Sequence, residues 1–259
     1  MLGGRVAVIS GGLGDIGRAI GREMARNGAA VAIGDLSEQA VGAAELASAG
    51  WDGVPVRYDR VDVSDGAAVA EWLARVESDL GVPDLIVPNA AQVTAKGALS
   101  ITAAEWEREL AVNLSGAFHL ARSAAARLLA ARRPGRIVFV GSWAGHVPHP
   151  HIPAYSVAKA GLRMLCRCMA LELAPHDILV NEVAPGYVDA GLSGRMFDAD
   201  PALRIRSEAV VPVRRLIEPE DVAREVLHLC DPAVRHLVGS VVLMDGGLSL
   251  RSPAEPADA

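Results

Sequence analysis

Short apolar runs alternate with helix-like segments along almost the whole chain of 259 residues. Each run is continuously apolar, which is typical of strands buried on both faces of a parallel sheet. A helical segment follows most of the runs, so that helices would connect neighbouring strands. Strands are expected at residues 5–10, 30–34, 54–61, 84–88, 136–142, 178–183 and 240–244. The pattern predicts an α/β fold, with a doubly wound parallel sheet of about seven strands and helices on both faces.

The segments between the strands divide into clear helices and one segment without periodicity. Helices are expected at residues 15–27, 37–49, 64–80, 102–132, 158–172 and 220–230, whereas 187–219 is expected to be irregular. No Pro-, Gly- or Ser-rich linker divides the chain, so residues 1–250 are predicted to form a single domain. The remaining residues, 251–259, are rich in Pro, Ala and Asp and are expected to be disordered.

Composition excludes several classes of partner. The net charge is −6 and the chain has no basic stripe, which argues against nucleic-acid binding. No apolar run is long enough to span a membrane, and no signal-peptide pattern opens the chain. The three cysteines lack metal-ligand spacing, and such a small odd set is typical of reduced thiols in the cytoplasm. We therefore expect a cytoplasmic protein with no membrane or nucleic-acid partner.

A glycine-rich turn, Ser10-Gly-Gly-Leu-Gly-Asp-Ile-Gly17, joins the first expected strand to the first helix. Glycines there let the backbone approach a pyrophosphate, and the helix start offers free N–H groups and a positive dipole. Asp35 ends the next strand, where its carboxylate can accept hydrogen bonds from both ribose hydroxyls of an adenosine. Asp35 alone would also suit a helix cap or a turn. In combination, these features predict a Rossmann-type site for NAD.

A second motif, Tyr155-Ser-Val-Ala-Lys159, lies at the start of the 158–172 segment. Residues four apart on a helix share one face, and an ammonium beside a phenol lowers the pKa of the phenol. Ser142 stands at a predicted strand end, from which its hydroxyl could hold a substrate oxygen. The alternative is an ordinary surface Tyr and Lys, because this spacing is frequent by chance. The motif predicts proton transfer to or from a carbonyl or alcohol oxygen.

These motifs together resemble the short-chain dehydrogenases/reductases, and the resemblance extends over about residues 4–247. Ser10, Gly11 and Gly17 match the cofactor loop of the family, but Asp15 stands where the family has its middle glycine. Other matches are shorter. They are Asp62-Val63, which resembles the adenine-contacting pair; Asn89-Ala90, followed by Ala91 in place of glycine; and Pro185-Gly186, beside the nicotinamide, with Ala190 in place of the usual Thr.

The resemblance implies a catalytic set of Asn113, Ser142, Tyr155 and Lys159. Tyr155 would exchange a proton with the substrate oxygen, which Ser142 would hydrogen-bond. Lys159 would lower the pKa of Tyr155 and bind the nicotinamide ribose. Asn113 would hold a backbone kink and a water linking Lys159 to solvent. The implied cofactor contacts are Ser10, Gly11, Leu13, Asp15, Ile16, Gly17, Asp35, Leu36, Asp62, Val63, Asn89, Ala90, Tyr155, Lys159, Pro185, Gly186 and Val188.

The substrate side is less well marked. His146, His149 and His151 lie in a proline-rich loop between Ser142 and Tyr155. Three histidines could bind a metal, but an extended loop at the mouth of the pocket is the favoured interpretation, and no metal site is expected. The candidate substrate contacts are Trp143, His149 and Tyr187, and residues 187–215 would shape the pocket.

The expected function is an NAD-dependent oxidoreductase that interconverts a secondary alcohol and a ketone, with no particular substrate indicated. Three alternatives remain: a reductase of carrier-bound 3-oxoacyl chains, a nucleotide-sugar isomerase or dehydratase, and a non-catalytic cofactor-binding regulator. The lack of a basic patch, the short segment after Gly186 and the intact catalytic set argue against them in turn. The 102–132 and 158–172 helices are apolar nearly all round, which predicts a two-fold symmetric homodimer or homotetramer.

Overall fold

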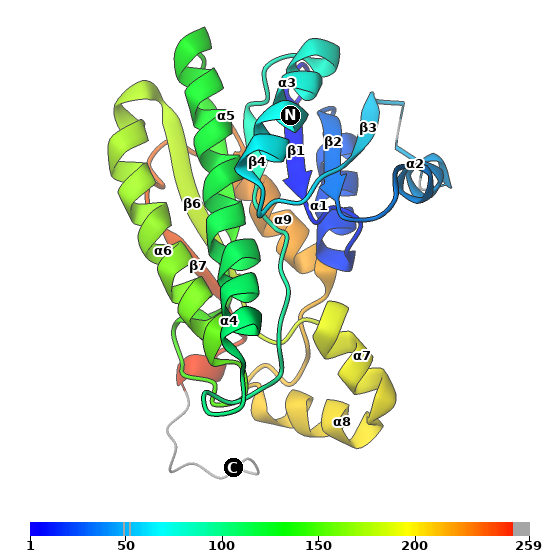
Figure 1. Ribbon diagram of the computed structural model, residues 1–259, viewed down its shortest axis with the longest axis vertical. Helices are drawn as coiled ribbons and strands as arrows, with labels where there is room; N and C mark the ends of the chain where they lie inside the picture. Colours follow the sequence, from blue (N-terminus) through cyan, green and yellow to red (C-terminus); the bar gives the residue numbers. More distant parts are fainter. Residues whose placement is uncertain (49, 52, 251–259) are drawn as a thin grey trace.

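The computed structural model describes residues 1–48, 50–51 and 53–250. Within them, seven strands form one parallel sheet in the order β3-β2-β1-β4-β5-β6-β7 (Figure 1). The strands are β1 (Val6–Ser10), β2 (Ala30–Asp35), β3 (Val56–Arg60), β4 (Leu85–Val87), β5 (Gly135–Val140), β6 (Ile178–Pro185) and β7 (Val241–Met244). The strand order reverses between β1 and β4, which creates a crevice at the carboxyl ends of these strands. The predicted fold class is confirmed.

Helices cover both faces of the sheet. They are α1 (Asp15–Arg26), α2 (Gln39–Ser48), α3 (Gly66–Leu80), α4 (Ala103–Leu110), π-helical η1 (Ala111–Gly116), α5 (Ala117–Ala131), η2 (Trp143–Gly145), α6 (Pro153–Leu173), η3 (Ala174–His176), α7 (Gly191–Ala199), α8 (Pro201–Val210), α9 (Pro219–Cys230) and η4 (Leu248–Leu250). One core includes Trp72 of α3, Leu120 of α5 and Leu162 of α6. The other includes Ile20 of α1 and Val226 of α9. Helix α1 packs against α9, far away in sequence, so the first and last parts of the fold support each other.

The segment expected to be irregular, 187–219, instead contains α7 and α8, and that prediction was wrong. Helix α8 begins at Pro201 and is capped by Asp200, whose side chain accepts hydrogen bonds from Ala202 N and Leu203 N. Both are strong helix-start signals that outweigh the mixed polarity of the segment. A proline likewise starts α6 at Pro153, five residues earlier than expected, which brings Tyr155 inside the helix.

The predicted 102–132 helix is interrupted by the π-helical segment η1, so its backbone is wider around Asn113 than an α-helix would be. The expected disorder of 251–259 concerns residues outside the described part of the chain. No helix among the described residues is both long and apolar enough to cross a membrane.

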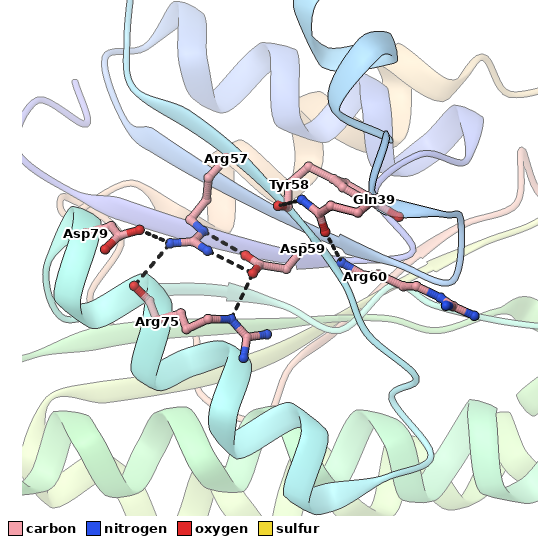
Figure 2. Close-up of polar contacts among 7 residues, drawn as sticks. All are labelled: Gln39, Arg57, Tyr58, Asp59, Arg60, Arg75 and Asp79. Atoms are coloured by element: carbon pink, nitrogen blue, oxygen red, sulfur yellow. Dashed lines mark hydrogen bonds and ion pairs between the residues drawn. The ribbon is translucent and has the colours of Figure 1, made fainter. Parts of the chain in front are cut away.

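Strand β3 forms one edge of the sheet, and an amide side chain occupies part of its outer backbone (Figure 2). Gln39 Nε2 donates to Tyr58 O at 2.8 Å, and Arg60 N donates to Gln39 Oε1 at 3.0 Å. Because Gln39 binds backbone groups that another strand could pair with, it protects this edge against strand addition.

The buried side chain of Asp59 on β3 is fully paired (Figure 2). Arg57 donates from Nε to Oδ2 at 2.7 Å and from Nη2 to Oδ1 at 2.8 Å, while Arg75 Nε donates to Oδ1 at 3.0 Å. Arg57 also forms an ion pair with Asp79 of α3. These contacts tie β3 to α3 at the edge of the sheet.

Candidate active site

A cavity of about 1020 Å³ opens at the carboxyl ends of the strands. Its walls come from the glycine-rich loop after β1, the ends of β2, β4, β5 and β6, and the start of α7. This is the crevice where open α/β sheets bind their ligands. Nearly all predicted cofactor and substrate residues line it, although they lie far apart in the sequence.

The glycine-rich loop closes tightly onto α1. A Cβ added at Gly17 would lie 2.3 Å from Gly11 O and 2.7 Å from Gly12 Cα, so only glycine fits there. Helix α1 begins after Gly14 with no side-chain cap, and residues 13–17 all line the cavity. The helix N-terminus therefore presents backbone N–H groups and a positive dipole to an anion. These features fit the pyrophosphate of a dinucleotide.

Asp15, which replaces the middle glycine of the family pattern, forms a bond across the cavity rim. Its Oδ2 accepts a hydrogen bond from Gly191 N at 2.8 Å, at the beginning of α7. The carboxylate is thus engaged by a backbone donor of the segment that follows β6.

Asp35 lies at the cavity wall with both carboxylate oxygens oriented by backbone donors. Leu13 N donates to Oδ2 at 3.1 Å and Leu36 N donates to Oδ1 at 2.7 Å. The loop after β1 therefore holds this carboxylate beside the end of β2, where a dinucleotide ribose binds in folds of this type. Asp62 also lines the cavity and is bonded by Ser64 and Arg108.

Two predicted site residues lie behind the cavity wall and do not line it. Ser10 Oγ accepts hydrogen bonds from Asn89 N at 3.1 Å and Ala90 N at 3.2 Å. Asn113, buried in η1, accepts from Gln92 N at 3.0 Å and donates to Gln92 O at 2.7 Å. These two side chains fix the turn after β4, so the direct contact predicted for Ser10 is corrected to a supporting one.

Tyr155 and Lys159 stand one turn apart on α6, as predicted, with Lys159 Nζ 5.4 Å from the centre of the Tyr155 ring. Lys159 is buried and donates to Val140 O at 2.7 Å. Burial raises the pKa of Tyr155 to about 12, although a hydrogen bond with Ser142 partly offsets this. Burial also lowers the pKa of Lys159 to about 8, with partial compensation from Glu182.

These values correct the expectation that Lys159 lowers the pKa of Tyr155 toward neutrality. In the structure, desolvation of the phenol outweighs the other influences on its pKa. The ammonium is directed to the carbonyl at the end of β5. What remains of the prediction is the geometry: a phenol, a lysine and a serine hydroxyl meet at one end of the cavity.

Ser142 follows β5 and caps η2, where its Oγ accepts a hydrogen bond from Ala144 N at 3.1 Å. The three candidate substrate residues stand nearby and contact one another. Trp143 packs edge-on against His149 and Tyr187, with ring centres 4.4 and 5.3 Å apart. His149 Nδ1 lies 2.7 Å from Val147 O, so it donates its proton there and leaves Nε2 as an acceptor. Through these ring contacts, Trp143, His149 and Tyr187 form one aromatic wall of the cavity.

The cavity also contains residues that sequence reasoning did not single out. They include Gln92, Val93 and Ala95 after β4, Pro150 and Ile152 after β5, and Ser193 in α7. None carries a motif of its own, and only the folding of the segments after β4, β5 and β6 brings them together. Of the three loop histidines, His149 and His151 line the cavity and His146 does not. Burial and the charge of Arg163 lower the pKa of His146.

Known proteins resemble this chain over nearly its full length. A family model described as enoyl-(acyl carrier protein) reductase matches residues 12–249. The cis-4-hydroxycyclohexanecarboxylate dehydrogenase of Sinomonas cyclohexanicum is 38% identical, over 94% of this chain and 96% of that protein. An inactive 2-(S)-hydroxypropyl-CoM dehydrogenase 2 of Xanthobacter autotrophicus is 39% identical, over 88% of this chain and 98% of that protein. A solved structure from Agrobacterium tumefaciens with bound NADP superimposes with a TM-score of 0.86, 26% identity and coverage of 96% and 98%.

Proposed function

Because the chain belongs to the short-chain dehydrogenase/reductase family, we propose that it is an NAD-dependent dehydrogenase interconverting a secondary alcohol and a ketone. The observation that carries this proposal is the meeting of Ser142, Tyr155 and Lys159 at one end of the cavity. The glycine-rich loop and Asp35 lie at the other end. We propose that one domain over residues 1–250 holds both ends, with 187–215 shaping the substrate pocket, and that it works in the cytoplasm.

Each residue has a role that follows from its chemistry. A bound nicotinamide supplies the hydride acceptor or donor, and residues 13–17, Asp35 and Pro185-Gly186 would hold the cofactor. Ser142 donates a hydrogen bond to the substrate oxygen, and Tyr155 exchanges the proton with that oxygen. Lys159, whose Nζ lies 5.4 Å from the centre of the Tyr155 ring, would bind the nicotinamide ribose beside the reacting oxygen. Asn113 keeps the neighbouring turn in place and would hold a water on the proton path.

Asp35 supports NAD over NADP. A 2′-phosphate beside its carboxylate would place like charges close together, and at ~4 Å with an effective dielectric of about 20 they repel by roughly 4 kcal/mol before relaxation and salt. Arg60, one candidate cation, is paired with Glu38. Arg18 also lines the cavity, and a cation there favours NADP as the alternative cofactor.

The substrate wall suits a cyclic and largely apolar alcohol. Aromatic faces from Trp143, His149 and Tyr187 can pack on a saturated ring, and His151, which also lines the cavity, could donate a hydrogen bond to a carboxylate on its far side. The relative that acts on cis-4-hydroxycyclohexanecarboxylate makes this hydroxy acid the first compound to test. Reduction of 3-oxoacyl chains is the second candidate function, favoured by a 29% identical relative of Aquifex aeolicus that is named a 3-oxoacyl-(acyl-carrier-protein) reductase.

The decisive experiment is a panel of secondary alcohols with NAD and NADP, in which reduced cofactor is followed by absorbance. It includes cis- and trans-4-hydroxycyclohexanecarboxylate, polyols, sugars and hydroxysteroids, and carrier-bound 3-oxoacyl chains in the reverse direction. Turnover of at least one cyclic alcohol with NAD is expected. Cofactor binding without turnover of any compound would instead favour a regulatory protein, and turnover of carrier-bound chains alone would favour the second candidate.

We further propose a two-fold symmetric dimer or tetramer. The outer sides of α5 and α6 expose large apolar residues: Phe118 is 38%, Met164 56% and Leu171 82% exposed. A helix that covers a sheet needs only one apolar stripe, so these side chains suit a subunit contact. Light scattering at micromolar concentration should give the mass of two or four chains; a stable monomer would contradict the proposal.

A further inference from the structure

Helix α6 carries a third charged or proton-bearing residue in line with its catalytic pair. Tyr155, Lys159 and Arg163 are spaced four apart, which places them on one side of the helix. The Arg163 side chain is only 11% exposed, although arginine is normally a surface residue. The reaction proposed above assigns no role to it.

Arg163 binds the turn that carries the catalytic serine. Its Nη1 donates to Gly145 O at 2.9 Å, and its Nη2 lies 3.5 Å from Ser142 O. Both carbonyls belong to the turn η2 and its cap, which also contains Trp143. One guanidinium therefore connects the catalytic helix to the residues that hold the substrate oxygen and form the aromatic wall.

A buried carboxylate stands behind Arg163. Glu182 lies in β6 with no exposed surface, and its Oε1 is 3.4 Å from Arg163 Nη2. Its other oxygen, Oε2, has no hydrogen-bond partner among the described residues. A Cβ added at Gly141 would lie 2.0 Å from Glu182 Oε1, so the carboxylate rests directly on the backbone that precedes Ser142.

We propose that Glu182 and Arg163 are positioning residues, in which Arg163 fixes the Ser142 turn and the carboxylate of Glu182 keeps Lys159 protonated. This inference rests on the proposed function and deepens it. A negative charge near an ammonium favours the charged form, and the effect is strong where water is excluded. Among the described residues Arg163 is the one hydrogen-bond partner of Glu182, so the ionised carboxylate would be neutralised by few other groups.

The other groups around Glu182 agree with this assignment. Lys159 Nζ donates to Val140 O at 2.7 Å, and Glu182 Oε1 rests on Gly141, the next residue, so the ammonium and the carboxylate reach adjacent points of the β5 end. Burial, and then the charge of Glu182, raise the pKa of the Cys166 thiol on the same helix. Its strand neighbours on β5 and β7, Phe139 and Val241, are uncharged. Burial raises the pKa of Glu182, and the charges of Arg163, Lys159 and Arg167 act in the opposite direction. The three cations thus offset part of the effect of burial.

The sequence permits a direct measurement, because Lys96 and Lys159 are its two lysines. Selective isotope labelling of lysine gives two side-chain signals, and NMR titration reports each protonation midpoint. Replacing Glu182 by Gln should lower the midpoint of Lys159 by about one pH unit, the size of a typical charge effect in proteins. Lys96, paired with Glu105 on another part of the surface, serves as the internal reference and should not move.

The matched control is Asp84→Asn. Asp84 is a buried carboxylate bonded by Arg5 at 2.9 Å and Arg133 at 3.0 Å, at the start of β4. Its replacement should lower stability and leave the Lys159 midpoint in place. An unchanged midpoint in folded Glu182→Gln, or an equal shift in Asp84→Asn, would overturn the electrostatic role of Glu182.

Kinetics complete the test with a substrate found in the panel. In Glu182→Gln, the limb of the kcat/KM profile governed by Lys159 should move to lower pH by the amount seen in the titration. Merely structural damage would lower the whole profile without moving it. Arg163→Lys keeps the positive charge but cannot form the two-branched hydrogen bonds of a guanidinium. Its kcat should fall about tenfold, while the limb of the kcat/KM profile stays at the same pH. Wild-type kcat in Arg163→Lys would overturn the positioning role.

The double variant Arg163→Met with Glu182→Gln covers the case in which a single change prevents folding. Removing both charges leaves no unpaired ion, so the double variant should be more stable than Arg163→Met alone. Equal stability would show that the residues do not act as a pair. If the wild type turned over no compound while its lysine titration behaved as described, the proposed function would fail and the electrostatic assignment would stand.

Discussion

Two buried carboxylates of the same sheet have opposite surroundings. Asp59 on β3 receives three N–H groups from two arginines, and both of its oxygens are used (Figure 2). Glu182 on β6 has one long contact to Arg163 and an oxygen with no partner among the described residues. The charge of a fully paired carboxylate is largely neutralised by its own ion pairs. An incompletely paired carboxylate can shift the pKa values of other titratable groups nearby.

The two carboxylates therefore have different roles: Asp59 contributes to stability, and Glu182 influences the chemistry of the site. Around Asp59 the charges balance locally, at the edge of the sheet and away from the cavity. Glu182, in contrast, acts on Lys159: burial lowers the pKa of this lysine to about 8, and the charge of Glu182 partly offsets that shift. Changes at the β3 edge should therefore alter stability and leave the reaction intact, whereas changes at Tyr155, Lys159, Arg163 and Glu182 should alter the reaction itself.

The largest expected effect is on the catalytic side. Tyr155→Phe keeps the ring and removes the transferable proton, so kcat should fall by about 10²–10⁴-fold, as is typical of acid–base groups. Cofactor affinity, measured by quenching of tryptophan fluorescence, and the unfolding midpoint should stay close to wild type. Near-normal turnover of a true substrate would show that Tyr155 is not the proton-transfer group.

The next effect concerns the paired edge. Asp59→Asn leaves Arg57 and Arg75 without their shared carboxylate, and the free energy of unfolding should fall by about 2 kcal/mol, less than for a fully buried pair because the arginines are partly exposed. Urea denaturation measures this loss, and the kcat/KM of the folded variant should match wild type. A tenfold loss of kcat/KM without loss of stability would reverse the contrast between the two carboxylates.

Asp35 tests a third carboxylate, which is held by backbone donors and faces the cavity. The wild type should prefer NAD by at least about tenfold in kcat/KM, or ~1.4 kcal/mol. Asp35→Ala should narrow the gap mainly by weakening NAD, and a further change of exposed Leu36 to Arg should improve NADP. Asp35→Asn is the matched control, since it retains an acceptor oxygen without the charge. Equal kcat/KM values for the two cofactors in the wild type would contradict the assignment.

The smallest effect is expected at Gln39. Gln39→Ala removes two hydrogen bonds from the exposed backbone of β3 and should cost about 1 kcal/mol of unfolding free energy, because water replaces the lost partners. Activity should be unchanged, but the variant should aggregate faster on mild heating as the sheet edge becomes available. Light scattering during a thermal ramp follows this, with Glu38→Ala as a neighbouring surface control.

The sequence predicted the sheet well, because continuous apolar strands and the Ser10–Gly17 turn leave few other ways to fold. It also placed Tyr155, Ser142 and Lys159 together, since their spacing on a helix and after a strand is nearly independent of the rest of the chain. The mixed polarity of residues 187–219 hides helices α7 and α8, although Asp200-Pro201 is a local start signal for α8.

What the sequence did not reveal depends on contacts between distant elements. Desolvation of Tyr155 requires several loops around it, so the direction of its pKa shift was predicted wrongly. Arg163 and Glu182 were overlooked, although two signals were present. Arg163 follows Lys159 by one helical turn, and Glu182 is the one charged residue of a mostly apolar strand. Only the packing of α6 on β6 brings the side chains of Arg163 and Glu182 together.

The contact between Gly141 and Glu182 has a consequence for how related sequences can diverge. Any side chain at position 141 would collide with the Glu182 carboxylate, which has no exposed space into which to move. Conversely, a smaller residue at position 182 would leave room for a side chain at 141. The two positions should therefore covary among relatives, with glycine at the first wherever glutamate occupies the second. A change at position 141 becomes neutral only after position 182 has changed, so the order of mutations along a lineage is constrained.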